Sequence, residues 1–322
     1  MLFNKIVHIS PTPLVGAPGK IALAQRQTGK ESICFILSDY PSSGPLYQKF
    51  SSNSILLTED NSDFFYEKIS GADVVHIHNF IPDKHEKKIR SSIGESLLVY
   101  HAHSPLREGP LFYDRSTQLS YDVKLVVGQH WGRLHTEHIA VPNIIFDTPS
   151  INLRKEGELL KVMYSPTHKH KGRWTSKGSS KLDKVLDGLL SCKMIELIRP
   201  KKPVSPYELF QLRRTCHLTI DEIITGGFHQ VSIEGMCAGN IVVNGADFLG
   251  KACYSRFSDG EFPPFLYAND DTITDTLVNL ASNVEETRRM QQESYDFFVK
   301  YCDYKKLVEF YDVAYRVKEN IS

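Results

Sequence analysis

The segment Asp221–Val243, DEIITGGFHQVSIEGMCAGNIVV, carries the pattern that decides the fold. It follows a short apolar run, passes through the turn Gly226-Gly227, and continues into a helical stretch that Gly239 ends before a second apolar run. Glycines let a backbone approach a ligand closely, and the free N–H groups at a helix start point toward such a ligand. The segment therefore predicts a strand, turn, helix and strand that bind a ligand where the first strand ends.

Glu234 lies about two turns into this helix, and its neighbours are apolar. A carboxylate in such surroundings is costly unless it is paired or hydrogen-bonded. Two interpretations fit. Glu234 is either a structural residue bonded to the backbone or to an arginine, or a binding residue whose partners are the two hydroxyls of a ribose.

Short apolar runs alternate with amphipathic stretches along the whole chain, as is typical of parallel sheets flanked by helices. In the first half we expect strands at residues 5–10, 32–37, 54–58, 73–78, 97–103 and 123–128, and helices at 20–30 and 61–70. In the second half we expect strands at residues 161–165, 194–198, 217–220 and 240–244, and helices at 179–190 and 229–238. The polar stretch 147–158 between the halves predicts a linker, and two such domains predict a ligand cleft beyond the strand ends.

The composition of the 322 residues excludes several functional classes. Lys plus Arg and Asp plus Glu number 38 each, so the basic surplus of a nucleic-acid-binding protein is absent. The six cysteines show no paired spacing, which predicts reduced thiols in a cytoplasmic protein. No stretch approaches the roughly 20 apolar residues that cross a bilayer. The basic segment 82–92 leaves contact with the inner face of a membrane as an alternative to a solvated helix face.

From Gly227 onward the segment follows the spacing G-[FY]-x5-E-x-M-x-x-G-x-[PIV]-V. This spacing resembles the donor-site signature of GT-B glycosyltransferases, particularly the retaining enzymes of glycosyltransferase family four. The resemblance implies two Rossmann-like parallel-sheet domains that face a cleft. It places an acceptor domain at residues 1–147 and a nucleotide-sugar donor domain at 148–302, and it implies that the helix 303–322 packs back on the first domain.

The same resemblance assigns roles within the donor site. It implies that Glu234 holds the nucleotide ribose. The family's second Glu, eight residues earlier, is replaced here by Gly226. We therefore expect the backbone amides of Gly227, Phe228 and His229 to take over part of its role in binding the donor.

A basic loop after the strand at residues 161–165 is a further candidate. It ends in Lys177-Gly178-Ser179, which resembles the Lys-Gly-[ST] helix start of a bacterial polysaccharide subgroup of the family. The resemblance implies that Lys177 binds the donor diphosphate and stabilises it as leaving group, with Arg173 as a second cation. The alternative for this loop is a solvated charged segment.

The loop after the first strand resembles the family's glycine-rich loop, which lies against the donor phosphates, and Gly16 permits the close approach. Two later strands end in alternating histidines, His76 with His78 and His101 with His103, and each pair shares one sheet face. The resemblance implies a catalytic role for His103 at the donor sugar. For His76 and His101 we expect core residues with satisfied hydrogen bonds. Four histidines also fit a metal site, but there is no Asp-x-Asp triplet and we expect no metal.

Together these features imply transfer of a hexosyl group from a nucleotide-sugar donor to a glycan or lipid-linked saccharide, with retention and without a cofactor. Two alternatives remain open. A nucleotide-sugar epimerase has the same architecture. A non-catalytic GT-B protein that binds glycan or serves as a partner subunit is favoured by Gly226 in place of Glu.

Overall fold

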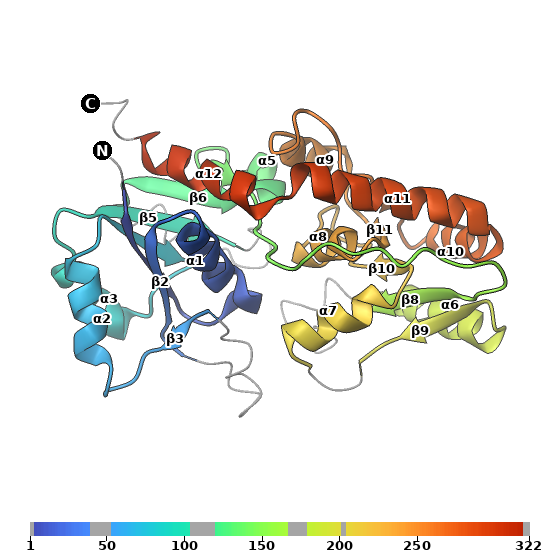
Figure 1. Ribbon diagram of the computed structural model, residues 1–322, viewed down its shortest axis with the longest axis horizontal. Coiled ribbons are helices and arrows are strands. Elements are labelled where there is room, and N and C mark those ends of the chain that lie inside the picture. Colours follow the sequence, from blue (N-terminus) through green and yellow to red (C-terminus); the bar gives the residue numbers. More distant parts are fainter. Residues whose placement is uncertain (1–2, 39–52, 104–119, 167–178, 201–203, 318–322) are drawn as a thin grey trace. The chain divides into compact units, whose positions relative to one another are not determined.

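The computed structural model describes residues 3–38, 53–103, 120–166, 179–200 and 204–317, except for the side chains of residues 83, 84, 133 and 134 (Figure 1). The chain divides into two compact units. Unit 1 comprises Met1–Phe146 and Tyr304–Ser322, and unit 2 comprises Asp147–Asp303.

Unit 1 is built on a parallel sheet with the strand order β3-β2-β1-β4-β5-β6-β7. The strands are β1 (Lys5–Ser10), β2 (Glu31–Ile36), β3 (Ile55–Leu56), β4 (Val74–His78), β5 (Leu97–Ala102), β6 (Val123–Val127) and β7 (Ile139–Val141). The helices are η1 (Leu14–Gly16), α1 (Ala17–Gln27), α2 (Ser62–Ser70), α3 (Asp83–Ser92), η3 (Gly128–His130), α5 (Trp131–Leu134) and α12 (Tyr304–Tyr315).

The two faces of the unit 1 sheet differ in chemistry, because alternate residues of a strand point to opposite faces. One face is apolar: Val7, Val75 and Tyr100 pack with Phe65 of α2 and Ile89 of α3 in one core cluster. The opposite face carries the histidines of β1, β4 and β5, and side chains of α1 and α12 hydrogen-bond to them. Both faces are buried, so the sheet lies between two layers of helices.

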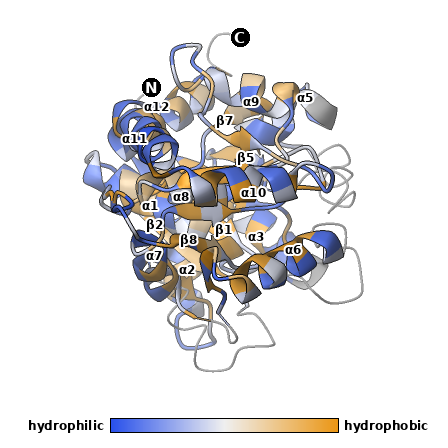
Figure 2. Cartoon of the chain, turned by 90° about the vertical axis from the view of Figure 1, so that its right-hand side faces the viewer, coloured by the Kyte–Doolittle hydropathy of each residue, from blue (hydrophilic) through white to orange (hydrophobic). Residues whose placement is uncertain are grey.

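Unit 2 has a five-stranded parallel sheet with the order β12-β11-β10-β8-β9. The strands are β8 (Leu160–Tyr164), β9 (Ile195–Ile198), β10 (Leu218–Ile220), β11 (Ile241–Asn244) and β12 (Leu266–Tyr267). The helices are α6 (Ser180–Ser191), α7 (Pro206–Arg214), α8 (Gln230–Cys237), α9 (Phe248–Ser255), α10 (Ile273–Ser282) and α11 (Val284–Tyr301). Figure 2 shows apolar colouring on the strands and a largely hydrophilic α11.

Helix α8 packs against its sheet at a distance that requires a glycine. A Cβ atom on Gly235 would lie 2.9 Å from a methyl carbon of Val242 and 3.1 Å from Cβ of Thr219. The opposite face of the sheet packs against α6 and α10 through an aliphatic cluster that includes Leu186 and Leu277. This packing fixes the start of α8 at the carboxyl edge of β10.

The expected strands, and the expected helices before residue 303, are confirmed to within three residues, and β1 has the bounds that the sequence predicts. The expected helix 303–322 corresponds to α12, which ends at Tyr315. Helix α7 begins with a capping box: Ser205 accepts the N–H of Glu208, and the Glu208 carboxylate accepts the N–H of Ser205. The sequence analysis missed β7, β12 and α9, which are short. In the described part of the chain, no helix is both long and apolar enough to cross a bilayer.

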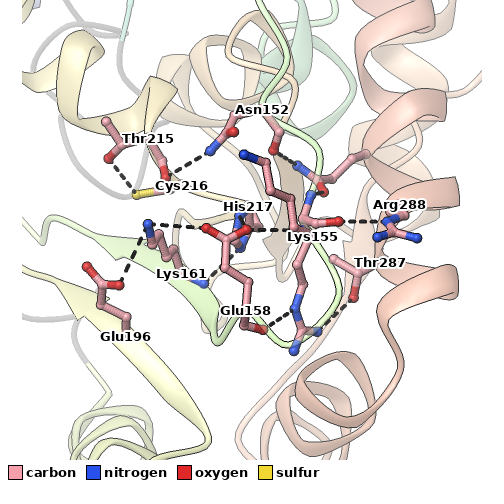
Figure 3. Close-up of polar contacts among 12 residues, drawn as sticks. Asn152, Lys155, Glu158, Lys161, Glu196, Thr215, Cys216, His217, Thr287 and Arg288 are labelled. Atoms are coloured by element: carbon pink, nitrogen blue, oxygen red, sulfur yellow. Dashed lines mark hydrogen bonds and ion pairs between the residues drawn. The ribbon is translucent and has the colours of Figure 1, made fainter.

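The polar stretch 147–158 is not a free linker, and that expectation was wrong. It belongs to unit 2 and runs along the amino-terminal edge of its sheet (Figure 3). Arg154 is buried and donates to the carbonyls of Leu280 and Ala281 at 2.7 Å each, so it caps the carboxyl end of α10. Glu158 accepts the N–H of Lys155 at 3.0 Å. The polar side chains that suggested a solvated linker are therefore used to satisfy backbone groups.

Candidate functional site

In unit 2, Asp221 closes the loop that follows β10. Its Oδ2 accepts the backbone N–H of His229 at 2.6 Å and the hydroxyl of Ser232 at 2.8 Å. Burial disfavours the charged carboxylate, but His229 and the hydrogen bonds outweigh it, so the pKa of Asp221 is lowered. The ionised Asp221 thus ties the strand end to the first turn of α8.

This loop explains the departure from the family pattern at Gly226. Gly226 has φ +75°, a left-handed conformation that glycine adopts without strain. Glu222, which the sequence analysis missed, accepts the N–H groups of Ile224 and Thr225 at 2.8 and 2.9 Å. Burial raises the pKa of Glu222. Replacing Gly226 by a residue with a side chain would strain the turn to which Asp221 and Glu222 hydrogen-bond.

The residues after the turn are partly engaged within the protein. Phe228 is fully buried, with its ring centroid 4.8 Å from that of Phe265 and 5.6 Å from that of Tyr254. The amide of His229 donates to Asp221. The amide of Gly227 makes only a long contact of 3.4 Å to the hydroxyl of Thr225. Of the three amides expected to bind the donor, that of His229 is therefore already used.

Glu234 is paired with an arginine. Its Oε2 accepts from Nη1 of Arg213 at 2.7 Å and its Oε1 from Nε2 of Gln230 at 2.7 Å. Arg213, on α7, is fully buried, and its Nε and Nη2 have no partner among the described residues. The arginine bond that the structural interpretation expects is present. It does not exclude ribose hydroxyls as further partners, and the role of Glu234 toward a ribose stays a prediction. The sequence gives no signal that Arg213, 21 residues earlier, is the partner.

Lys177 and Arg173 lie outside the described residues, so their roles stay predictions. The helix start that follows them is visible. Ser179 is the N-cap of α6: its hydroxyl oxygen accepts the N–H of Leu182 at 3.0 Å, and its hydroxyl donates to Asp270. Lys177 therefore lies two residues before this N-cap.

In unit 1, the loop between β1 and α1 is strained. Leu14, Val15 and Gly16 have consecutive positive φ angles of 45°, 56° and 79°. Only glycine adopts such angles freely, and a β-branched residue in this region costs of the order of 1 kcal/mol or more. Val15 is also 58% exposed. Such strain is common at ligand sites, and here it lies beside the predicted site residue Gly16.

His103 is anchored by a residue that the sequence analysis missed. The backbone N–H of His103 donates to Oδ1 of Asn79 at 2.8 Å, and the N–H of Asn79 donates to the carbonyl of His101 at 2.8 Å. Asn79 itself has φ +60°. A polar residue directly after the alternating histidines of β4 was the available signal for this contact.

The structure brings five histidines together, His8, His76, His78, His101 and His103, and we call them the histidine cluster. Burial lowers the pKa of every member, that of His8 to about 4 and that of His103 to about 3. The cluster is therefore neutral at pH 7.

Two members of the cluster were expected to be satisfied core residues. His76 meets this expectation at Nδ1, which lies 2.8 Å from the hydroxyl of Tyr315, but its Nε2 has no hydrogen-bond partner among the described residues. His101 is a buried core residue, as expected, but its hydrogen bonds are not satisfied: neither ring nitrogen has a partner in the described part of the chain. Ring contacts hold it instead: its centroid is 4.0 Å from that of His103.

The cluster also contains two overlapping triplets, His8 with His76 and His78, and His78 with His101 and His103. In each, one ring nitrogen per residue lies within 4.8 Å of the others. A nitrogen lone pair lies in the plane of its ring, so metal ligands must converge in their planes. The rings of His76 and His78 are instead stacked, at 4.3 Å and 12°. This arrangement suits neutral, hydrogen-bonded rings better than an ion.

A cavity of about 740 Å³ lies at the amino-terminal edge of the unit 1 sheet, lined by residues such as Lys5, Arg26 and Glu31. Ligands of parallel sheets bind at the carboxyl edge. The cavity is therefore at the wrong edge for the predicted site, and it borders Asn53, which follows the undescribed residues 39–52.

No protein-family model matches the chain, and no curated protein matches it. Solved structures match over almost the whole chain. Sucrose-phosphate synthase from Thermosynechococcus elongatus has a TM-score of 0.62 and 9% identity, covering 99% of this chain and 100% of that one. HepE from Anabaena, solved with UDP, has a TM-score of 0.59 and 12% identity, covering 98% and 99%.

A glycosyltransferase from Rickettsia africae has a TM-score of 0.57 and 10% identity, covering 99% of this chain and 100% of its own. At such identities the likeness establishes the fold. The expected architecture of two Rossmann-like domains is confirmed, and the chain has the GT-B fold of these glycosyltransferases.

Proposed function

We propose that this chain is a glycosyltransferase that moves a hexosyl group from a nucleotide-sugar donor to a glycan or lipid-linked saccharide acceptor. The observation that carries the proposal is the carboxyl edge of the unit 2 sheet. There the turn Gly226-Gly227 leads into α8, and α8 holds the ionisable Glu234 against Arg213. A structural relative with the same fold was solved with UDP.

The contact with Arg213 suits Glu234 to bind a ribose. A carboxylate has room to accept more than two hydrogen bonds. The bonds from Arg213 and Gln230 orient the group and are compatible with ribose hydroxyls as further donors. The backbone amides of Gly227 and Phe228 would contact the donor at this turn.

The donor diphosphate would be held at the start of α6. Lys177 and Arg173 supply positive charge just before the Ser179 N-cap, where helix amides also favour an anion. In unit 1, the loop at Gly16 would contact the donor phosphate, and the side chain of His103 would contact the donor sugar.

In the proposed reaction the bond from the anomeric carbon to the diphosphate oxygen breaks, and the acceptor hydroxyl oxygen forms the new bond to that carbon. The hydroxyl proton passes to the leaving diphosphate. Lys177, Arg173 and the helix amides stabilise the negative charge that develops on the leaving group. We propose that the reaction retains the anomeric configuration, needs no metal or cofactor, and takes place in the cytoplasm, where the lipid-linked acceptors of a membrane's inner face are accessible.

Calorimetric titration with UDP, GDP, CMP and dTDP tests the donor site. Glu234→Gln keeps an oxygen for Arg213 but removes the charge, so we expect one nucleotide to bind about tenfold more weakly, which corresponds to about 1.4 kcal/mol. Glu158→Gln is the matched control, because Glu158 lies at the opposite edge of the same sheet (Figure 3).

Two results would contradict the proposal. If folded protein binds none of the nucleotides, it is a non-catalytic GT-B protein. If it converts a nucleotide sugar without any acceptor, it is an epimerase. Equal loss of binding in Glu158→Gln and Glu234→Gln would show that the effect is not specific to the ribose site.

A further inference from the structure

A hydrogen-bonded series runs through the histidine cluster and ends at His103, which is partly buried. Nε2 of His8 lies 2.7 Å from Oε1 of Gln25, and Nδ1 of His8 lies 2.9 Å from Nε2 of His78. Nδ1 of His78 lies 2.7 Å from Nε2 of His103. His8 and His78 are fully buried and His103 is half-buried, so the series leads outward from the interior to the least buried ring of the cluster.

We infer that Gln25, His8 and His78 are positioning residues that hold His103 in its Nε2–H tautomer, so that an unprotonated Nδ1 faces the ligand. The site would therefore take a neutral hydroxyl donor, such as a sugar hydroxyl, in preference to an anion. The inference rests on the proposed function only in naming the sugar as the ligand.

Gln25 determines which atom is the donor in each hydrogen bond of the series. Its Oε1 accepts from the hydroxyl of Ser32 at 2.7 Å, and its Nε2 donates to the hydroxyl of Tyr315 at 3.2 Å. The atom that faces His8 is therefore an acceptor, so Nε2 of His8 must carry the proton. A neutral imidazole has one donor and one acceptor, so Nδ1 of His8 accepts from Nε2–H of His78.

Because the neutral His78 ring donates through Nε2, its Nδ1 must accept. The proton between His78 and His103 is therefore on Nε2 of His103, which donates to Nδ1 of His78. Nδ1 of His103 is then an acceptor. The rule holds because the rings are neutral: burial lowers the pKa of each, and neighbouring rings of the cluster would repel a second charge. The tautomer of this least buried ring is thus set by a glutamine three residues away along the series.

The position of His103 is fixed from its backbone as well. Asn79 accepts its N–H and donates to the carbonyl of His101. With the backbone held by Asn79 and Nε2 held by His78, the ring has little freedom to rotate. Nδ1 therefore presents its lone pair in a defined direction. A hydroxyl can donate to this lone pair, whereas a fully ionised phosphate has no proton to give.

Nitrogen NMR of the full chain with ¹⁵N-labelled histidine reads the tautomers directly, without substrate. At pH 7 we expect protonated Nε2 and unprotonated Nδ1 signals for His8, His78 and His103. Addition of glycerol should shift the Nδ1 signal of His103, and sulfate, an anion that carries no proton at pH 7, should leave it unchanged. An Nδ1–H or doubly protonated His103, or a sulfate response in place of the glycerol response, would overturn the inference.

Variants of Gln25 separate positioning from packing. Gln25→Leu removes the acceptor, and His103 should shift from one tautomer to a mixture of both. Gln25→Glu keeps an acceptor toward His8 and should restore the single Nε2–H form. If Gln25→Leu does not fold, the comparison of wild type with Gln25→Glu still decides, because an Nδ1–H form of His103 in either contradicts the series.

Zinc ions provide a further control. The inference predicts that added Zn²⁺ leaves the nitrogen signals of the cluster unchanged, and metal-type shifts at His8, His76 and His78 would overturn it. Nucleotide binding by unit 2 is a separate measurement. A failure of the tautomer prediction therefore leaves the donor site standing, and the reverse is also true.

Discussion

Units 1 and 2 both bury a parallel sheet between helices, but they bury polar groups in opposite ways. Unit 1 buries neutral rings: four members of the histidine cluster are fully buried. Unit 2 buries charge and pairs it, as in the contact of Arg213 with Glu234 and the ionised Asp221 with its hydrogen bonds. A neutral, accepting site suits hydroxyls, and a site of oriented charges suits a nucleotide. The difference also predicts that acidification destabilises unit 1 first, whereas loss of an ion-pair partner destabilises unit 2.

Acidification should have the largest effect, and it should act on unit 1. A histidine has a pKa near 6.5 when unfolded, and the folded values of His8 and His103 are about 4 and about 3. The unfolded state therefore binds more protons below pH 6.5, so stability is complete above that pH and falls as the pH drops toward 4. Each such histidine contributes up to about 1.4 kcal/mol per pH unit.

Unit 2 has one comparable group among the described residues, His217, with a pKa of about 4. Hydrogen exchange followed from pH 7 to pH 4 should therefore show unit 1 losing protection before unit 2. Equal loss in both units would contradict the neutral state of the histidine cluster.

The second prediction concerns the buried ion pair of unit 2. Arg213→Met leaves the Glu234 carboxylate buried without its cation, which costs about 3–5 kcal/mol. The double variant Arg213→Met with Glu234→Met removes both charges and should recover most of this loss. Urea unfolding measures both. If the single and double variants are equally unstable, the pair does not act as a unit.

A third prediction concerns two buried histidines of unit 1. His101→Leu replaces a buried ring whose two nitrogens have no partner within the described part of the chain, so stability at pH 7 should stay equal or rise by about 1 kcal/mol. His76→Leu is the matched variant, because it also removes the contact with the Tyr315 hydroxyl and should destabilise. Thermal unfolding at pH 7 ranks them. A less stable His101→Leu would imply that His101 has a partner in solution.

The smallest effects concern the strained loop of unit 1. Gly16→Ala should cost about 1 kcal/mol through backbone strain alone, since the nearest atom to an added Cβ is 3.9 Å away. The control is Gly188→Ala within α6, where an added Cβ has open space and alanine favours the helix. Denaturation midpoints should move in opposite directions. The same direction in both would argue against a left-handed Gly16.

Much of the fold could be predicted from sequence because its signals are local. Apolar runs and the glycines at 226, 227 and 239 located β10, α8 and β11. The partners of the site residues were not predictable in this way. Arg213 meets Glu234 only because the tertiary fold brings α7 beside α8, and His8 meets His78 only because β1 lies beside β4.

The stretch 147–158 was wrongly predicted to be a linker for a related reason. Its polar composition resembles that of a linker, but Arg154 satisfies carbonyls that belong to a helix 126 residues later in the chain. Composition reveals which groups can hydrogen-bond and not where their partners lie. The roles of Lys177 and Arg173 stay predictions from the sequence.

Hydrogen exchange of the full chain with and without each nucleoside diphosphate tests the central claim, that unit 2 binds the nucleotide of a sugar donor at α8. The account predicts that one nucleotide slows exchange in residues 221–238, and that Glu234→Gln weakens this protection. No protection by any nucleotide, or protection confined to unit 1 with residues 221–238 unchanged, would contradict it.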